Sequence, residues 1–169
     1  GARVLEEASA RVPFGKKTAL RGASGIGKTT LVDLLLGHER PDAGRIQVAG
    51  VDLRSVPLAA WRARVALVPQ DVVIFRGTLA ENLRLAARGA SDAELLEAAA
   101  RAGLGELLGR APSGLAQSLS ERGQGLSGGE RQRTALARAL LPRPPLGAHR
   151  TLSQPSGAGR GNHSGPVEL

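Results

Sequence analysis

The sequence contains no cysteine and no methionine, and aromatic residues make up only 2% of its 169 residues. The absence of cysteine excludes disulfides, zinc–thiolate clusters and thiol nucleophiles. Phe14, Trp61 and Phe75 are the only aromatic side chains, too few for a platform on which nucleic-acid bases could stack. Apolar runs are only a few residues long, so we expect no membrane-spanning helix. These absences predict a soluble, cytosolic chain. Its 169 residues are enough to bury a core of its own.

Positive charge is in excess, but the basic residues are not clustered in the sequence. Lys and Arg number 23 against 15 Asp and Glu, a formal net charge of +8. The basic residues are scattered and usually have acids nearby, so the charge favours a solvated surface, and we expect no nucleic-acid partner. His38, His149 and His163 lack the spacing of metal ligands. No secretory signal is visible at the N-terminus, and because the chain begins with Gly1 we expect it to be a fragment.

The first part of the chain predicts an α/β core, because strand and helix patterns alternate there. Trp61 is expected to serve packing within this core. The predicted elements are a strand over 16–22, a helix over 28–36 closed by Gly37, a hairpin strand within 40–50, a short helix with Pro57 near its start, and an apolar strand over 65–68.

From Thr78 onward the pattern becomes helical. Ser91 and Glu94 form a capping box ahead of a helix that should stop at Gly103. A second capping box precedes a helix that ends at a proline. In that second helix, Ser127 and Glu130 form the capping box, Leu136 and Leu140 mark the buried face, and Pro142 ends the helix.

The last 27 residues, 143–169, contain five glycines and four prolines and have no apolar period. Such composition cannot bury enough apolar surface to offset the entropy of ordering. We therefore expect no packed element there and predict a disordered tail.

The segment "GASGIGKT" at 22–29 matches G-x-x-x-x-G-K-[ST] between a predicted strand and a predicted helix. Its glycines let backbone N–H groups wrap phosphate oxygens, and the helix N-terminus adds a partial positive charge. Lys28 would reach the β and γ phosphates, and the Thr29 hydroxyl would bind Mg²⁺. The alternative is a glycine-rich turn with an unrelated lysine. A dinucleotide fold is disfavoured, because Thr30 stands where the last glycine of G-x-G-x-x-G would be.

The segment "GLSGGERQR" at 125–133 places Ser127, Gly128 and Gly129 at a helix start. Small residues with N–H groups at a helix N-terminus suit an anion, although a serine followed by two glycines is usually only a cap.

The two motifs together resemble the ATP-binding domain of ABC transporters. Residues 22–30 are similar to its Walker A motif, and "LSGGERQRTALARALL" at 126–141 is similar to its signature motif and helix. Gln70 resembles the Q-loop glutamine, and "SERGQG" at 120–125 resembles the exporter-type branch. The resemblance covers residues 1–146. It implies an α/β fold: a P-loop NTPase core with an inserted α-helical subdomain, incomplete at its C-terminal side.

The resemblance also implies cofactors, partners and a division of the chain. ATP and Mg²⁺ would bind between the Walker A motif of one domain and the signature motif of a second, in a head-to-tail dimer. Residues 75–82, with Glu121 and Arg122, would touch a transmembrane partner. The implied parts are the core at 1–75, the helical subdomain at 76–141 and the tail at 142–169. The implied nucleotide contacts are Gly22, Ser24, Gly25, Gly27, Lys28, Thr29, Thr30, Gln70, Ser127, Gly128 and Gly129, with Thr29 and Gln70 also at Mg²⁺.

No catalytic residue is assigned. The family continues after the signature helix with an apolar strand ending in Asp-Glu and later a switch histidine, but this chain has no acid between Glu130 and Glu168. Without those acids, phosphoryl transfer to water lacks its main positioning groups. If the codons for residues 147–156 are read one base later, they permit Val-Leu-Thr/Ile-Glu-Pro-Ser-Ala-Ser-Leu, which resembles the missing run. A frame slip in the coding sequence is therefore one explanation of the tail, and a genuine tail is the other.

Three functions follow. The first is the ATP-binding domain of an exporter-type ABC transporter, defective in hydrolysis, at the cytoplasmic face of a bacterial plasma membrane. The second is a non-catalytic nucleotide-binding regulatory module. The third, an ABC-type ATPase acting on DNA, would need a coiled-coil or DNA-binding insertion, and none appears between Gln70 and Leu126.

Overall fold

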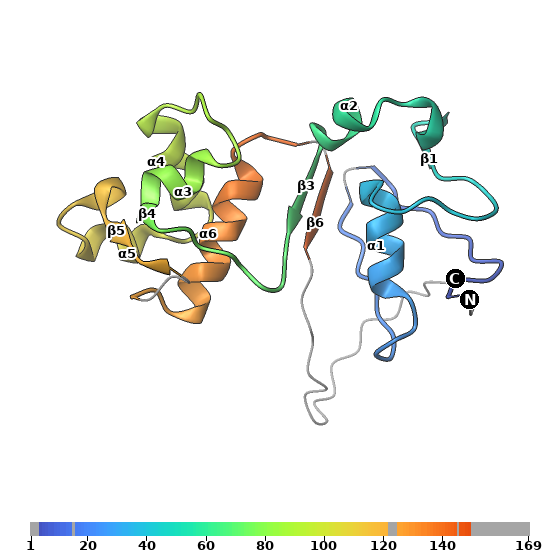
Figure 1. Cartoon of the computed structure of the whole chain (residues 1–169), viewed down its shortest axis with the longest axis horizontal. Helices are drawn as coiled ribbons and strands as arrows, with labels where there is room; N and C mark the ends of the chain where they lie inside the picture. Colours follow the sequence, from blue (N-terminus) through green and yellow to red (C-terminus); the bar gives the residue numbers. More distant parts are fainter. Residues whose placement is uncertain (1–3, 15, 122–124, 145, 150–169) are drawn as a thin grey trace. The chain divides into compact units, whose positions relative to one another are not determined.

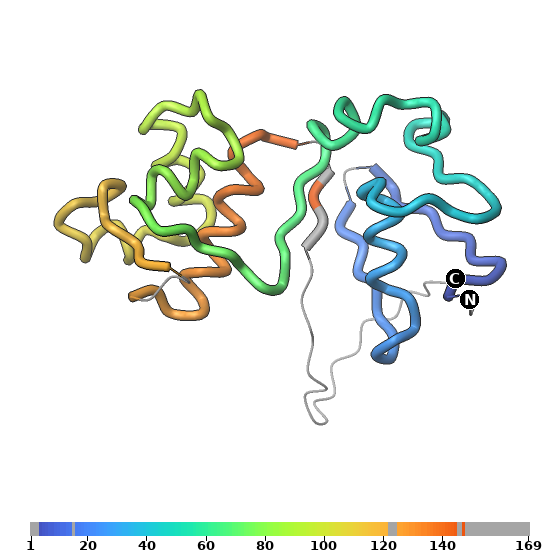
Figure 2. Tube along the Cα trace, viewed as in Figure 1, coloured from blue at the N-terminus to red at the C-terminus, as the bar shows by residue number. Residues whose placement is uncertain are grey.

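The computed structural model describes residues 4–14, 16–121, 125–144 and 146–149 (Figures 1 and 2). They group into two compact units that divide between Val56 and Pro57; unit 1 is the part up to Val56 and unit 2 the part from Pro57. No helix among these residues is long and apolar enough to cross a membrane. The predicted parts, 1–75, 76–141 and 142–169, were defined by function and not by contacts. The grouping of contacts therefore does not test them, and they stay a prediction.

The helix of unit 1, α1 (Lys28–Leu36), lies between two glycines in the left-handed region. Gly27 precedes it with φ 96°, and Gly37 ends it with φ 68°. The Gly37 N–H donates to carbonyl groups of the last turn, and glycine adopts this conformation without the steric cost of a Cβ. The helix predicted over 28–36 and its end at Gly37 are confirmed.

A short hairpin follows α1 in unit 1. Strands β1 (Gln47–Val48) and β2 (Val51–Asp52) pair antiparallel. The two residues between them, Ala49 and Gly50, have φ values of 50° and 81°, as a type I′ turn requires. The 3₁₀ helix η1 (Leu53–Ser55) comes next. The predicted hairpin is confirmed.

The strand predicted over 16–22 is wrong. These residues are described, but none of them forms a strand, and nearly all are exposed. A strand needs a neighbour that completes its ladder of backbone hydrogen bonds. Within the described part of unit 1 the only ladder joins β1 to β2, so the segment at 16–22 has no such neighbour there.

Unit 2 begins with α2 (Leu58–Arg62), whose Trp61 is buried as predicted, and β3 (Val65–Val68). Both elements were predicted, including the position of Pro57 directly before α2. The remaining elements are β4 (Gly77–Thr78), α3 (Leu79–Arg84), α4 (Asp92–Arg101), α5 (Gly105–Arg110), η2 (Gly114–Ala116), β5 (Ser118–Leu119), α6 (Gly128–Leu140) and β6 (Leu146–His149).

Capping boxes start α3, α4 and α6. In each, a side-chain hydroxyl accepts from the N–H three residues on, and the glutamate there accepts from the cap's own N–H. The boxes of α4 and α6 confirm the predictions for Ser91 and Ser127. The box of α3, formed by Thr78 and Glu81, was missed, although the T-x-x-E pattern is readable in the sequence.

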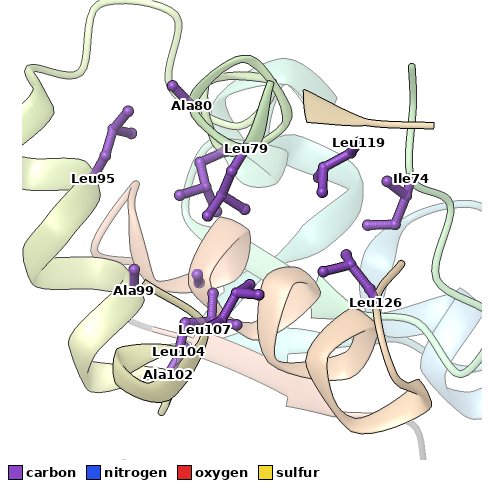
Figure 3. Close-up of a cluster of buried hydrophobic side chains, with 12 residues drawn as sticks. Ile74, Leu79, Ala80, Leu95, Ala99, Ala102, Leu104, Leu107, Leu119 and Leu126 are labelled. Atoms are coloured by element: carbon purple, nitrogen blue, oxygen red, sulfur yellow. The ribbon is translucent and has the colours of Figure 1, made fainter. Parts of the chain in front are cut away.

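The hydrophobic core of unit 2 is formed mainly by α3, α4, α5 and α6 (Figure 3). Figure 3 shows Leu79, Leu104 and Leu107 pointing into this cluster. Leu136 and Leu140, the predicted buried face of α6, are partly buried and pack against it. Its buried members are Ile74, Leu79, Ala80, Leu83, Leu95, Ala99, Ala102, Leu104, Leu107, Leu119, Leu126 and Ala137.

Strand β6 corrects the prediction that no packed element follows residue 142. It pairs parallel with β3 over four residues, from Val65 opposite Leu146 to Val68 opposite His149, and Figure 1 shows the two strands side by side. Two prolines precede it, which favour an extended backbone, and ladder bonds use backbone groups that every non-proline residue carries. Pairing therefore overrides the weak apolar pattern. The rest of the predicted disordered tail, 150–169, lies outside the described residues.

Candidate nucleotide-binding site

The phosphate loop of unit 1 surrounds the ammonium group of Lys28. Lys28 Nζ donates to the carbonyl oxygens of Gly22 and Ala23, at 2.7 and 2.6 Å. These bonds fold the side chain back over the loop that precedes its own helix. A positive charge therefore stands where the motif expects phosphate oxygens to bind.

Three glycines of the loop have conformations that L side chains rarely adopt. Gly22 has φ 157°, Gly25 has φ 84° and Gly27 has φ 96°. A Cβ at Gly25 would meet nothing within 4 Å, whereas a Cβ at Gly27 would lie 3.0 Å from the side chains of Val4 and Leu5. Gly27 is thus constrained both by its backbone and by close packing, and Gly25 only by its backbone.

The first turn of α1 carries no acidic residue, so its partial positive charge is not offset there by a carboxylate. Ser24 and Thr29 are exposed, and Thr30 is half-buried. Glycines with positive φ, a lysine ammonium and a helix N-terminus make a donor set that fits the phosphate groups of ATP. The Thr29 hydroxyl is the Mg²⁺ ligand that this set would supply.

The second predicted anion site lies at the start of α6 in unit 2. Ser127 Oγ accepts from Glu130 N at 3.2 Å, and Ser127 N donates to Glu130 Oε2 at 2.7 Å. The Ser127 side chain is thus engaged with Glu130 as the cap of α6. Gly128 and Gly129 are exposed beside it.

Glu130 anchors this start of α6. It is 5% exposed and also pairs with Arg110. Hydrogen bonding from the Ser127 backbone N–H, and then from its side chain, lowers the pKa of Glu130 from its ordinary value of 4.5, although burial opposes the shift. The carboxylate therefore stays ionised and holds Ser127 in place at neutral pH.

One side chain, that of Arg133, lies close to the exposed Gly129. A Cβ there would lie 3.1 Å from Arg133 Nη1, so glycine leaves room for the guanidinium one turn further along α6. This requirement was not anticipated from the sequence, where Gly129 was considered only for its N–H group.

Gln70 follows β3 and lies beside the same helix. Its carbonyl oxygen accepts from Gln132 Nε2 at 2.6 Å. Gln70, Gly128, Arg131 and Gln132 help to line an open depression of about 400 Å³. The structure thus brings the predicted Q-loop residue and the signature helix together within unit 2.

The segment predicted to meet a transmembrane partner begins at Phe75, and exposed apolar side chains lie at its start and just before it. Val73 is 60% exposed and Phe75 is 54% exposed. Glu121 is exposed as well, whereas Arg122 lies outside the described residues. Val73 was not singled out from the sequence, because an isolated valine in a short apolar run carries no signal of exposure.

The chain is similar to known transporters. The family model for "ABC transporter" matches residues 5–147. Human "Iron-sulfur clusters transporter ABCB7, mitochondrial" is 44% identical over 146 residues, which are 86% of this chain and 19% of that protein. The "ATP-dependent lipid A-core flippase" of Thiobacillus denitrificans is 45% identical over 143 residues, 84% of this chain and 25% of that protein.

A solved structure supports the same assignment. A bacterial Atm1-family ABC exporter with ATP bound is similar with a TM-score of 0.71 and 40% identity, covering 75% of this chain and 22% of the exporter. The chain spans about a fifth to a quarter of the length of the curated relatives named above. The family match, the phosphate loop and the signature helix give one conclusion: the chain belongs to the ABC transporter family, as an ATP-binding domain of the exporter type with a P-loop NTPase fold.

Proposed function

We propose that the chain binds Mg-ATP and couples that binding to the movement of a transmembrane partner. The observation that carries this proposal is the arrangement of the phosphate loop, where the Lys28 ammonium is held over the loop by Gly22 and Ala23. ATP would contact the backbone of residues 22–30 through its phosphates, and Lys28 would bind the β and γ phosphates. Thr29 and Gln70 would serve Mg²⁺.

The proposed assembly is a head-to-tail pair with a second ATP-binding domain. In that pair the nucleotide at one phosphate loop meets Ser127, Gly128 and Gly129 of the other domain, whose N–H groups at a helix start suit the γ phosphate. The exposed apolar side chains of Val73 and Phe75 are the proposed surface for the transmembrane partner. That partner would hold the chain at the cytoplasmic face of a membrane; the relatives include bacterial flippases and mitochondrial transporters alike.

The alternative function is a regulatory module that binds nucleotide without turning it over. It is favoured by one observation, the lack of any acid between Glu130 and Glu168. Pairing with an intact homologue that depends on ATP but not on its hydrolysis would support the module over the transporter subunit.

The phosphate loop is tested by Lys28→Ala. The substitution removes a charged donor to phosphate, and a hydrogen bond to a charged group contributes about 1.5–3 kcal/mol. We expect the affinity for Mg-ATP, measured by isothermal titration calorimetry, to fall roughly tenfold to a hundredfold.

Lys17→Ala is the matched control, because Lys17 is an exposed lysine of the same unit outside the loop. The control should bind as the unaltered chain does. Equal affinities for the Lys28→Ala and Lys17→Ala variants would refute the role assigned to Lys28.

A further inference from the structure

Helix α6 holds the loop after β3 at two separate points. Gln132 Nε2 donates to the Gln70 carbonyl at 2.6 Å, and Arg138 Nη1 donates to the Val73 carbonyl at 2.6 Å. The donors are six positions apart on the helix, a distance of about 9 Å along its axis. The acceptors lie 62 and 65 residues away from them in sequence. Two long-range bonds from one helix therefore hold the backbone at residues 70 and 73.

Asn82 of α3 extends this attachment to Phe75. Its Oδ1 accepts from Phe75 N at 3.0 Å and from Arg138 Nη2 at 2.6 Å. Its Nδ2 donates to the carbonyl oxygens of Phe75 and Thr78, at 2.8 and 2.9 Å. The side chain is only 1% exposed, and these four bonds use its full donor and acceptor capacity on this geometry. Asn82 therefore joins the loop, α3 and α6 at one buried point.

The guanidinium of Arg138 makes three of these contacts. Besides Val73 O and Asn82 Oδ1, it donates from Nε to the Asn82 carbonyl at 2.8 Å. All three acceptors are neutral, the side chain is half-buried, and burial lowers the pKa of Arg138. A charge placed among neutral acceptors offers less stability than one paired with a carboxylate. A planar fork, however, reaches three oxygens at once, which a lysine ammonium on a flexible stem does not reproduce.

The loop is held by backbone hydrogen bonds and by Ile74, whose buried side chain belongs to the core, while the side chains of Val73 and Phe75 face outward. Val73 and Phe75 are 60% and 54% exposed, yet the Val73 carbonyl and both polar groups of the Phe75 backbone are bonded inward. The backbone bonds and the buried Ile74 together position the exposed side chains of Val73 and Phe75.

We propose that Gln132 and Arg138 are positioning residues that clamp residues 70–75 to α6, so that the exposed side chains of Val73 and Phe75 move as one body with the signature helix. This inference rests on the proposed function, in which those two side chains meet the transmembrane partner. A displacement of α6 at Ser127 would then reach the partner surface through the clamp, without a change inside the loop.

The absence of cysteine allows the clamp to be tested with single nitroxide labels on the full chain. One label is placed through Val73→Cys in the loop, and a reference label through Leu96→Cys, an exposed position on α4. Each is measured by electron paramagnetic resonance in the unaltered background and with Arg138→Lys, Gln132→Glu or Arg88→Lys. Gln132→Glu removes one donor at nearly constant shape, and Arg88→Lys is the control because Arg88 is exposed.

We expect a severalfold shorter rotational correlation time for the label at 73 in Arg138→Lys, a smaller shortening in Gln132→Glu, and no change in Arg88→Lys. The label at 96 should be unchanged throughout, a pattern that a general loss of stability would not give. A label at 73 that stays as immobile in both clamp variants as in the control would overturn the proposal. So would equal loosening at 73 and 96 in both, which would assign the two residues to stability alone. No nucleotide is present, so the result is independent of whether Lys28 binds ATP.

Discussion

Gly27 is a residue at which the phosphate loop depends on the absence of a side chain. Gly27→Ala would place a Cβ against Val4 and Leu5 at a φ of 96°. We expect it to destabilise unit 1 by about 1–3 kcal/mol and to weaken Mg-ATP binding, because the first N–H groups of α1 would move.

The measurements are urea unfolding and calorimetric ATP titration. Gly89→Ala is the matched control, since a Cβ there meets nothing within 4 Å and its φ lies outside the strained range. If both variants unfold at the same urea concentration and bind ATP equally well, the prediction that Gly27 must lack a side chain is wrong.

At the scale of elements, the stability of the fold should depend on pH through Glu130 at the start of α6. The Ser127 N–H lowers the pKa of this carboxyl in the folded chain, so its ionised form stabilises the fold above the ordinary value of 4.5 and this contribution is lost as pH falls below it. Glu130→Gln should cost about 1–3 kcal/mol at pH 7, from the loss of a charged partner for Ser127 N and Arg110.

Urea unfolding at pH 7 and at successively lower pH checks this prediction. The difference between the unaltered chain and Glu130→Gln should shrink below pH 4.5, with Glu106→Gln as the control for removing one exposed carboxylate. A difference that is constant with pH would contradict the assigned role of the ionised form.

The elements that the sequence predicts well are those set by local chemistry. Gly37 ends α1 and the hydroxyl of Ser91 starts α4 through contacts within a few residues, which a pattern can reveal. Residues 16–22 and β6 were predicted wrongly because a strand is defined by a distant partner. The bonds of Arg138 to Asn82 and Val73 were missed for the same reason, since they join positions 56 and 65 apart.

For the molecule as a whole, we expect ATP to bind without being turned over. The long stretch without an acid between Glu130 and Glu168 supplies no carboxylate to position the attacking water or to complete the Mg²⁺ shell. Phosphate release from Mg-ATP should equal that of Lys28→Ala at saturating nucleotide. Release that exceeds this background would show that another group replaces the missing acids.

In the proposed complex, nucleotide binding would exchange one set of hydrogen bonds of the Lys28 ammonium for another. Its two bonds to Gly22 O and Ala23 O compete with those it would form to phosphate oxygens, so ATP gains only the difference between the two sets. In the proposed complex, discrimination would depend on how strongly each incoming anion draws the ammonium away, and a doubly charged terminal phosphate would do so better than a singly charged one.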